Sequence, residues 1–235
     1  MKNLINKILF ILVSISIIYG CDNSKSNNYM SINGKIDGLR KGKLYLQQFV
    51  DSVFVSIDSI EVNNEFEFNL GTEIIEPDIY YLYLDKDDGD SINDRIKFFG
   101  NNGEITINSR LITFDTNPEI LGSDNQTLME EYQSIIRKFN LENLDLLEIY
   151  YDSQINGNNK QFDSVNDAIN NLIKRKYLYS LNFATTNSNY EISPFILSTE
   201  IPDANKELLN QVYDKFNDSI KVSKYGKLLM EIIND

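Results

Sequence analysis

The sequence predicts an α+β protein, with an N-terminal antiparallel β-sandwich or open barrel followed by a small C-terminal helical domain. In residues 29–118, apolar side chains recur at every second position, and turn-forming Asn and Gly residues separate the runs, as in a series of short strands. From residue 123 the apolar period lengthens to about 3.6 residues, which is typical of amphipathic helices. We therefore expect a β domain at 29–118 and a helical domain at 123–235.

Seven or eight short strands are expected in the first part. Asn63-Asn64 is a plausible hairpin turn, because Asn tolerates a positive φ. The segment 79–84 is apolar on both faces and therefore suits a central strand. The segments that carry the strand pattern are 30–32, 44–46, 53–62, 66–70, 79–84, 96–99 and 105–107.

Helices are expected through most of the second part. The first should begin near Ser123 or Asp124, either of which can cap it with a side-chain oxygen, and its apolar stripe reaches Phe139. A second helix is expected at 141–151, before a polar loop at 154–159. Three further apolar stripes lie within 162–177, 209–216 and 225–233.

The first residues predict export from the cytosol. Lys2 and Lys7 give a positive start, and residues 8–19 are almost wholly apolar. This run is shorter than the roughly 20 apolar residues that a membrane-spanning helix needs. Its length and basic start fit a secretory signal peptide instead.

The apolar run ends in Ile18-Tyr19-Gly20-Cys21, which resembles the lipobox of bacterial lipoproteins. The resemblance implies that diacylglycerol is attached to Cys21, that residues 1–20 are removed as a signal peptide, and that 21–28 is a flexible tether. Two or three acyl chains can hold a soluble domain on a membrane, whereas one is marginal. We expect a cell-envelope protein, anchored to the outer or inner membrane and facing the periplasm or the surface. An ordinary signal peptide with a chance Cys, or an uncleaved anchor, is the alternative.

Composition excludes several kinds of chemistry. The 235 residues include no His and one Cys, so Ser-His-Asp machinery, His-ligated zinc and a CxxC redox pair are absent. A formal charge of −13 argues against nucleic acid, whose phosphates require a basic face. We expect no catalytic residues, no cofactor and no enzymatic activity.

The order of several motifs resembles a known domain family. Ile32–Ile36 (INGKI), Gly42–Leu46 (GKLYL) and Phe98–Ile107 (FFGNNGEITI) occur in sequence. Together they resemble the domain of unknown function 4369, a β domain of Bacteroidota envelope lipoproteins. In that family it commonly precedes a helical connector and a thioredoxin-like domain of the AhpC/TSA or TlpA kind, and the helical part here is similar to the connector.

The resemblance implies an envelope location but no oxidoreductase activity, since the sequence carries no CxxC. Our first hypothesis is a non-catalytic, lipid-anchored binding or assembly module with an envelope protein as its partner. The second is a truncated accessory relative of thiol-disulfide oxidoreductase lipoproteins that lacks the catalytic domain. A calcium-stabilised or ligand-capturing surface lipoprotein is the third.

An aspartate-rich segment at 85–94 is a conceivable calcium site, because Ca²⁺ prefers oxygen ligands on a turning loop. Asp85, Asp87 and Asp90 are its first candidates. The spacing does not follow an EF-hand loop, and a solvated acidic loop between strands is the plainer interpretation.

Five Asp-Ser-aliphatic triplets exceed the roughly one that composition alone would give. They are similar to the O-glycosylation sequon of Bacteroidota periplasmic proteins. The candidate serines are Ser52, Ser59, Ser91, Ser164 and Ser219.

Two other clusters have structural explanations. The aromatic residues of 79–84 and 98–99 could line a ligand groove, but an aromatic strand is more often part of a core. The basic run 174–176 is expected to be a solvated helix face. The aromatic residues in question are Tyr80, Tyr81, Tyr83, Phe98 and Phe99.

Overall fold

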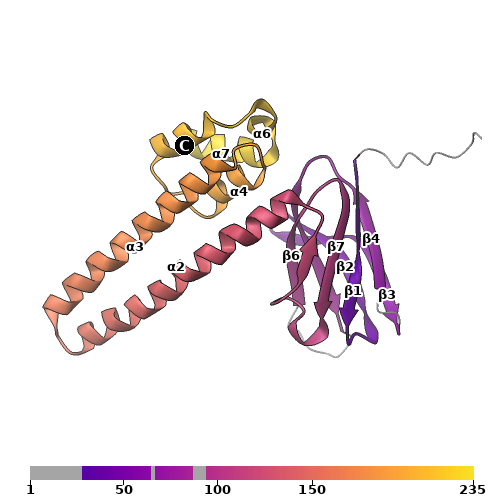
Figure 1. Ribbon diagram of the computed structural model, residues 1–235, viewed down its shortest axis with the longest axis horizontal. Helices are drawn as coiled ribbons and strands as arrows, with labels where there is room; N and C mark the ends of the chain where they lie inside the picture. Colours follow the sequence, from indigo (N-terminus) through magenta and orange to yellow (C-terminus); the bar gives the residue numbers. More distant parts are fainter. Residues whose placement is uncertain (1–27, 65–66, 87–93) are drawn as a thin grey trace, which may run out of the picture.

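The computed structural model describes residues 28–64, 67–86 and 94–235, and it has a β-sandwich at one end and helices at the other (Figure 1). The first sheet has the strand order β4 (Glu67–Glu73), β1 (Tyr29–Asp37), β7 (Gly103–Arg110), β8 (Glu119–Leu121). The second has the order β3 (Val53–Asn63), β2 (Lys41–Val50), β5 (Asp78–Asp85), β6 (Asp94–Gly100). The predicted sandwich followed by helices is confirmed.

One pair of strands departs from the antiparallel prediction. β1 and β7 run parallel, with Ile32 opposite Ile105. All four strands of the second sheet, and β4 of the first, lie between β1 and β7 in the sequence. Alternation of apolar residues is the same in either direction, so the sequence pattern could not reveal it.

The sandwich core lies between the two sheets. Its fully buried side chains include Phe98 from β6 and Leu82 from β5. The predicted Asn63-Asn64 turn is supported by the positive φ of 58° at Asn64. A tighter turn joins β2 to β3, where Asp51 and Ser52 both have positive φ (48° and 68°), as a type I′ turn requires.

Two long helices form an arm that extends away from the sandwich (Figure 1). α2 (Asp124–Ile155) is capped by Ser123, whose side chain accepts a hydrogen bond from the Gln126 amide. It is continuous through 141–151, so the predicted separate helix there is wrong. No Gly or Pro interrupts it, and the turn to α3 (Asn159–Thr186) is shorter than predicted.

Four shorter helices pack around the base of this arm. They have their own core, formed with α3 by residues such as Leu197, Leu209 and Leu229. Within the ranges that the structure describes, no helix combines the length and the apolar character needed to cross a membrane. The short helices are α4 (Ile192–Thr199), α5 (Lys206–Tyr213), α6 (Asp218–Val222) and α7 (Lys224–Asn234).

A third apolar cluster joins the sandwich to the helices. Ile79 and Phe99, on the outer face of the second sheet, pack with residues of α2, α4 and α7. The Phe99 ring lies 5.8 Å from the Phe195 ring and 6.2 Å from the Tyr225 ring, measured between centroids. We refer to this cluster as the junction.

A buried carboxylate lies beside the junction. Asp78, at the start of β5, accepts hydrogen bonds from the Lys224 ammonium at 2.7 and 2.9 Å and from the Tyr225 hydroxyl. Its oxygens also accept from the Ile79 amide at 2.7 Å and from the Gln48 amide group at 3.3 Å. Burial, and then the Asp78 charge, raise the pKa of Tyr225, so the phenol remains protonated and donates.

Candidate interaction surface on the second sheet

The β2–β3 hairpin exposes a run of large apolar side chains. Two of them are the aromatic residues Phe49 and Phe54, which face each other across the strands. Each member of the run is between 38% and 57% exposed. We call this the hairpin patch, and it consists of Phe49, Val50, Val53, Phe54, Val55 and Ile57.

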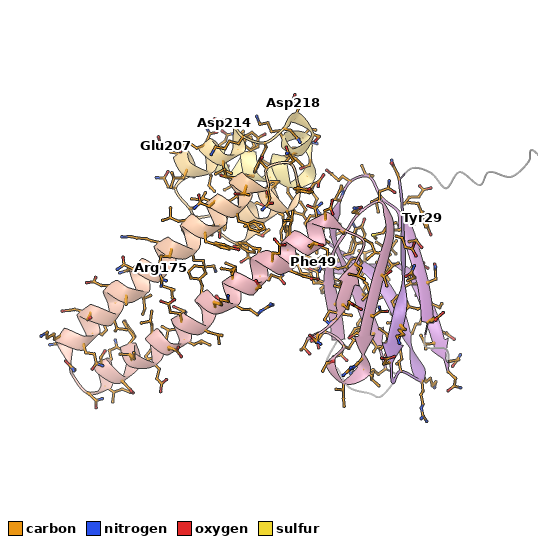
Figure 2. All side chains as sticks on the ribbon, viewed as in Figure 1. Tyr29, Phe49, Arg175, Glu207, Asp214 and Asp218 are labelled. Carbon is orange, nitrogen blue, oxygen red and sulfur yellow. The ribbon has the colours of Figure 1, made fainter. Side chains whose placement is uncertain are left out.

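A register shift between Leu46 and Gln47 sets the direction of the hairpin. Such a bulge bends the strand and increases its twist. The Phe54 ring reaches Tyr81 of β5, two strands away in the sheet order, with 5.0 Å between centroids. In Figure 2, Phe49 lies on the side of the sandwich that faces α2, whereas Tyr29 lies toward the other side.

Arg95 of β6 contacts the aromatic side chains on the outer face of the second sheet. Its guanidinium lies 4.3 Å from the centroid of the Phe54 ring and 4.4 Å from that of the Tyr83 ring. Its Nε donates a hydrogen bond to the Gln47 side chain at 3.1 Å. Stacked guanidinium and aromatic groups attract each other electrostatically, so Arg95 restrains the hairpin from across the sheet.

Arg95 also lines a groove of about 590 Å³ that runs between β6, the 115–118 loop and α2. We call it the edge groove. Its cationic side chains are Arg95, Lys97 and Arg137. Its remaining lining is Ile96, Asp115, Thr116, Asn117, Pro118, Ile120, Gln126, Met129, Glu130 and Gln133.

The electrostatics of the edge groove differ from those of the whole chain. Among the described residues, no carboxylate comes within ion-pair distance of its three cations. Loss of water around the Lys97 ammonium lowers its pKa, and the Glu200 carboxylate opposes this in part. The groove also contains two carboxylates, Asp115 and Glu130, so its three cations exceed its acids by one. Further acidic side chains lie among the short helices, for example Glu207, Asp214 and Asp218 (Figure 2).

The structure divides the predicted aromatic cluster into two groups. Tyr80, Phe98 and Phe99 are buried, which confirms the core interpretation for them. Tyr81 and Tyr83 are half-buried on the outer face of the second sheet. Desolvation is the first cause that raises the pKa of each of these two phenols.

The predicted calcium ligands are only partly within the described ranges. Asp85 ends β5, whereas Asp87 and Asp90 lie outside the described residues. In the ranges that are described, no three metal-ligating side chains gather at one point. The calcium site therefore stays a prediction.

Four of the five candidate serines are exposed. Ser52 is in the β2–β3 turn, Ser59 in β3, Ser164 in α3 and Ser219 in α6. The Ser219 hydroxyl donates to the Asn217 side chain at 2.7 Å. Exposure is necessary for glycosylation but does not test it.

Ser91 and Cys21 lie outside the described residues, so their modifications stay predictions. Arg175, within the predicted solvated run, is exposed on α3 and pairs with Glu142 of α2.

Sequence reasoning missed both the hairpin patch and the edge groove. The patch had a local signal, because Val53, Phe54 and Val55 are consecutive apolar residues in a strand that was expected to alternate. The edge groove had no local signal in the sequence, because Arg95 and Arg137 are far apart along the chain. Only the packing of α2 beside β6 brings them together.

One comparison with known proteins gives a match over the β part. The family described as Domain of unknown function (DUF4369) matches residues 30–129, which span the sandwich and the start of α2. No curated protein matches the chain. A solved structure titled "pT26-6p" is 12% identical and aligns over 83% of this chain and 41% of its own length. Its TM-score of 0.17 is too low to support any argument.

Proposed function

Since residues 30–129 match the family described as Domain of unknown function (DUF4369), we propose that this protein is a lipid-anchored component of a cell envelope. Its β domain serves as a non-catalytic module that binds another envelope protein. The observation that carries the binding role is the hairpin patch, where six large apolar side chains remain exposed on one hairpin.

The anchoring part of the proposal rests on the sequence. Cys21 is the only Cys, and it follows a small residue at the end of an apolar run, where a lipobox requires it. The polar segment 22–28 then leads to β1. Acyl chains, rather than basic residues, would provide attachment, because an acidic protein is repelled by anionic headgroups.

The binding part rests on the chemistry of the patch. Large apolar side chains that stay exposed are typical of interaction sites. Here they occupy both faces of the hairpin, since Val53 and Val55 alternate with Phe54 along β3. Aromatic residues and Arg contribute strongly to protein interfaces, and here Phe49, Phe54 and Arg95 lie next to one another. The Arg95 contacts fix the hairpin before a partner arrives, which reduces the entropy lost on binding.

In-cell photo-crosslinking tests the binding role on the native, anchored protein. A photoreactive amino acid at Val53, which is 57% exposed, should crosslink to a discrete envelope protein. The double variant Phe49→Ser and Phe54→Ser should lower this yield at least about ten-fold, as expected when hot-spot aromatics are removed. It should cost less than about 1 kcal/mol of unfolding free energy per site, because both rings are half-exposed.

The matched control is the same photoreactive amino acid at Ile112, which is 94% exposed and outside the hairpin. Identical crosslinked bands from both positions, or a Val53 band unaffected by the double variant, would refute a binding role for the patch. The identity of the captured protein decides between the hypotheses. A thioredoxin-like lipoprotein would favour the accessory role in thiol-disulfide exchange.

A further inference from the structure

β6 is the end strand of the second sheet, and its outer edge faces the edge groove. In a pair of antiparallel strands, residues whose backbone groups bond to the partner strand alternate with residues whose backbone groups point away from it. The Phe99 backbone N–H donates to the Gln126 side chain of α2 at 2.8 Å, so the backbone hydrogen-bonding groups of Phe99 point away from β5. By the same alternation, the backbone groups of Arg95 and Lys97 point into the groove.

Gln126 therefore supplies, at one position, the acceptor that a neighbouring strand would supply. Its amide group in turn donates to Glu130 at 2.7 Å, which fixes the orientation of the acceptor. Along 95–97, no strand from the described ranges occupies the corresponding place. The groove is within the usual size range of ligand sites, about 300–1,000 Å³.

Side chains around this edge alternate in character. Arg95 and Lys97 lie two residues apart on the same face of β6, so their spacing matches alternate residues of an extended chain. Ile96 between them points to the sandwich core. Ile120 and Met129, both buried, provide further apolar lining.

We propose that the edge groove binds an extended acidic peptide segment of a partner protein, which adds to β6 as a further strand. Acidic side chains at alternate positions meet Arg95 and Lys97, and a further carboxylate meets Arg137 on α2. Apolar side chains at the intervening positions face Ile96 and Ile120. This proposal rests on the proposed binding function and names the chemistry of the segment that is bound.

A strand is favoured over a small anion because the groove offers backbone groups in register with the cations. Main-chain hydrogen bonds give affinity in strand addition, and alternate side chains give specificity. Part of Arg95 is already committed to Gln47 and to two aromatic rings. A compact anion would use the cations but neither the strand edge nor the apolar lining.

The test uses the full chain in detergent micelles and a blocked octapeptide of four Glu-Val repeats. Fluorescence anisotropy should give a dissociation constant on the order of 100 µM or tighter. The peptide should also slow amide hydrogen exchange in the 94–100 segment. Methylating the peptide amides that face the edge should weaken binding at least about ten-fold, because ladder hydrogen bonds are lost. A Lys-Val peptide should not bind.

Arg137→Gln provides the protein variant, since this side chain is exposed and lies outside both cores. We expect it to weaken peptide binding about three-fold, and about ten-fold when combined with Lys97→Gln. The matched control is Lys138→Gln, which removes the same charge from the adjacent position of α2 outside the groove. It should change binding less than about two-fold.

Several outcomes would overturn the proposal. These are no binding, equal binding of the methylated peptide, or equal effects of Arg137→Gln and Lys138→Gln. Competition by millimolar inorganic phosphate, without protection of 94–100, would make the groove a small-anion site. None of these results alters the crosslinking from Val53, so failure of the strand addition is distinguishable from failure of the proposed function.

Discussion

Replacing Phe99 with Ala is expected to lower the free energy of unfolding by about 4 kcal/mol, as large-to-small changes of buried aromatic residues do. Phe99 is fully buried, and its ring contacts the rings of Phe195 and Tyr225. The cavity therefore opens in the junction, where the sandwich and the helices meet. Chemical denaturation of the purified protein measures the loss.

Phe98→Ala is the matched control, because the neighbouring ring is equally buried but lies in the sandwich core. A similar loss of stability is expected from it. The two variants should differ in hydrogen exchange: Phe99→Ala should increase exchange in α4 and α7 at concentrations of denaturant where Phe98→Ala does not. If both variants leave α4 and α7 equally protected, the junction does not couple the two parts as described.

Asp78→Asn is expected to destabilise the protein by about 2 kcal/mol. The substitution removes the charge that the Lys224 ammonium and the Tyr225 hydroxyl both contact. The expected loss is smaller than for a fully buried pair, because about half of the Lys224 side chain is exposed. Urea denaturation at neutral pH gives the difference in unfolding free energy.

Two further variants calibrate the Asp78 result. Tyr225→Phe removes one donor and should cost less, about 1 kcal/mol. Glu73→Gln, at an exposed carboxylate of β4, should change stability by less than about 0.5 kcal/mol. An Asp78→Asn variant no less stable than Glu73→Gln would mean that the carboxylate does not hold the sandwich to α7.

The sequence predicted most elements of the fold because local periodicity carries that information. Alternation identified the strands, and the capping role of Ser123 located the start of α2. The division of 124–155 into a helix that ends near Phe139 and a second helix at 141–151 was wrong. The two apolar stripes belong to one helix of a largely exposed arm, where no single continuous stripe is required.

The candidate site was much less accessible to prediction. The consecutive apolar residues Val53 to Val55 gave the only local signal for the hairpin patch. The contact of Arg95 with the Phe54 ring joins β6 and β3, the two ends of the strand order of the second sheet, and local periodicity does not specify such a contact. The edge groove depends on how α2 lies beside β6, which is a matter of tertiary packing.

Metabolic labelling with a palmitate analogue, in cells that express either the parent or Cys21→Ala, tests the anchoring claim most directly. We expect the parent to incorporate the label and to fractionate with envelope membranes, whereas the variant is unlabelled and is released from them. An unlabelled parent, together with a variant that remains in the membrane fraction as fully as the parent does, would contradict it.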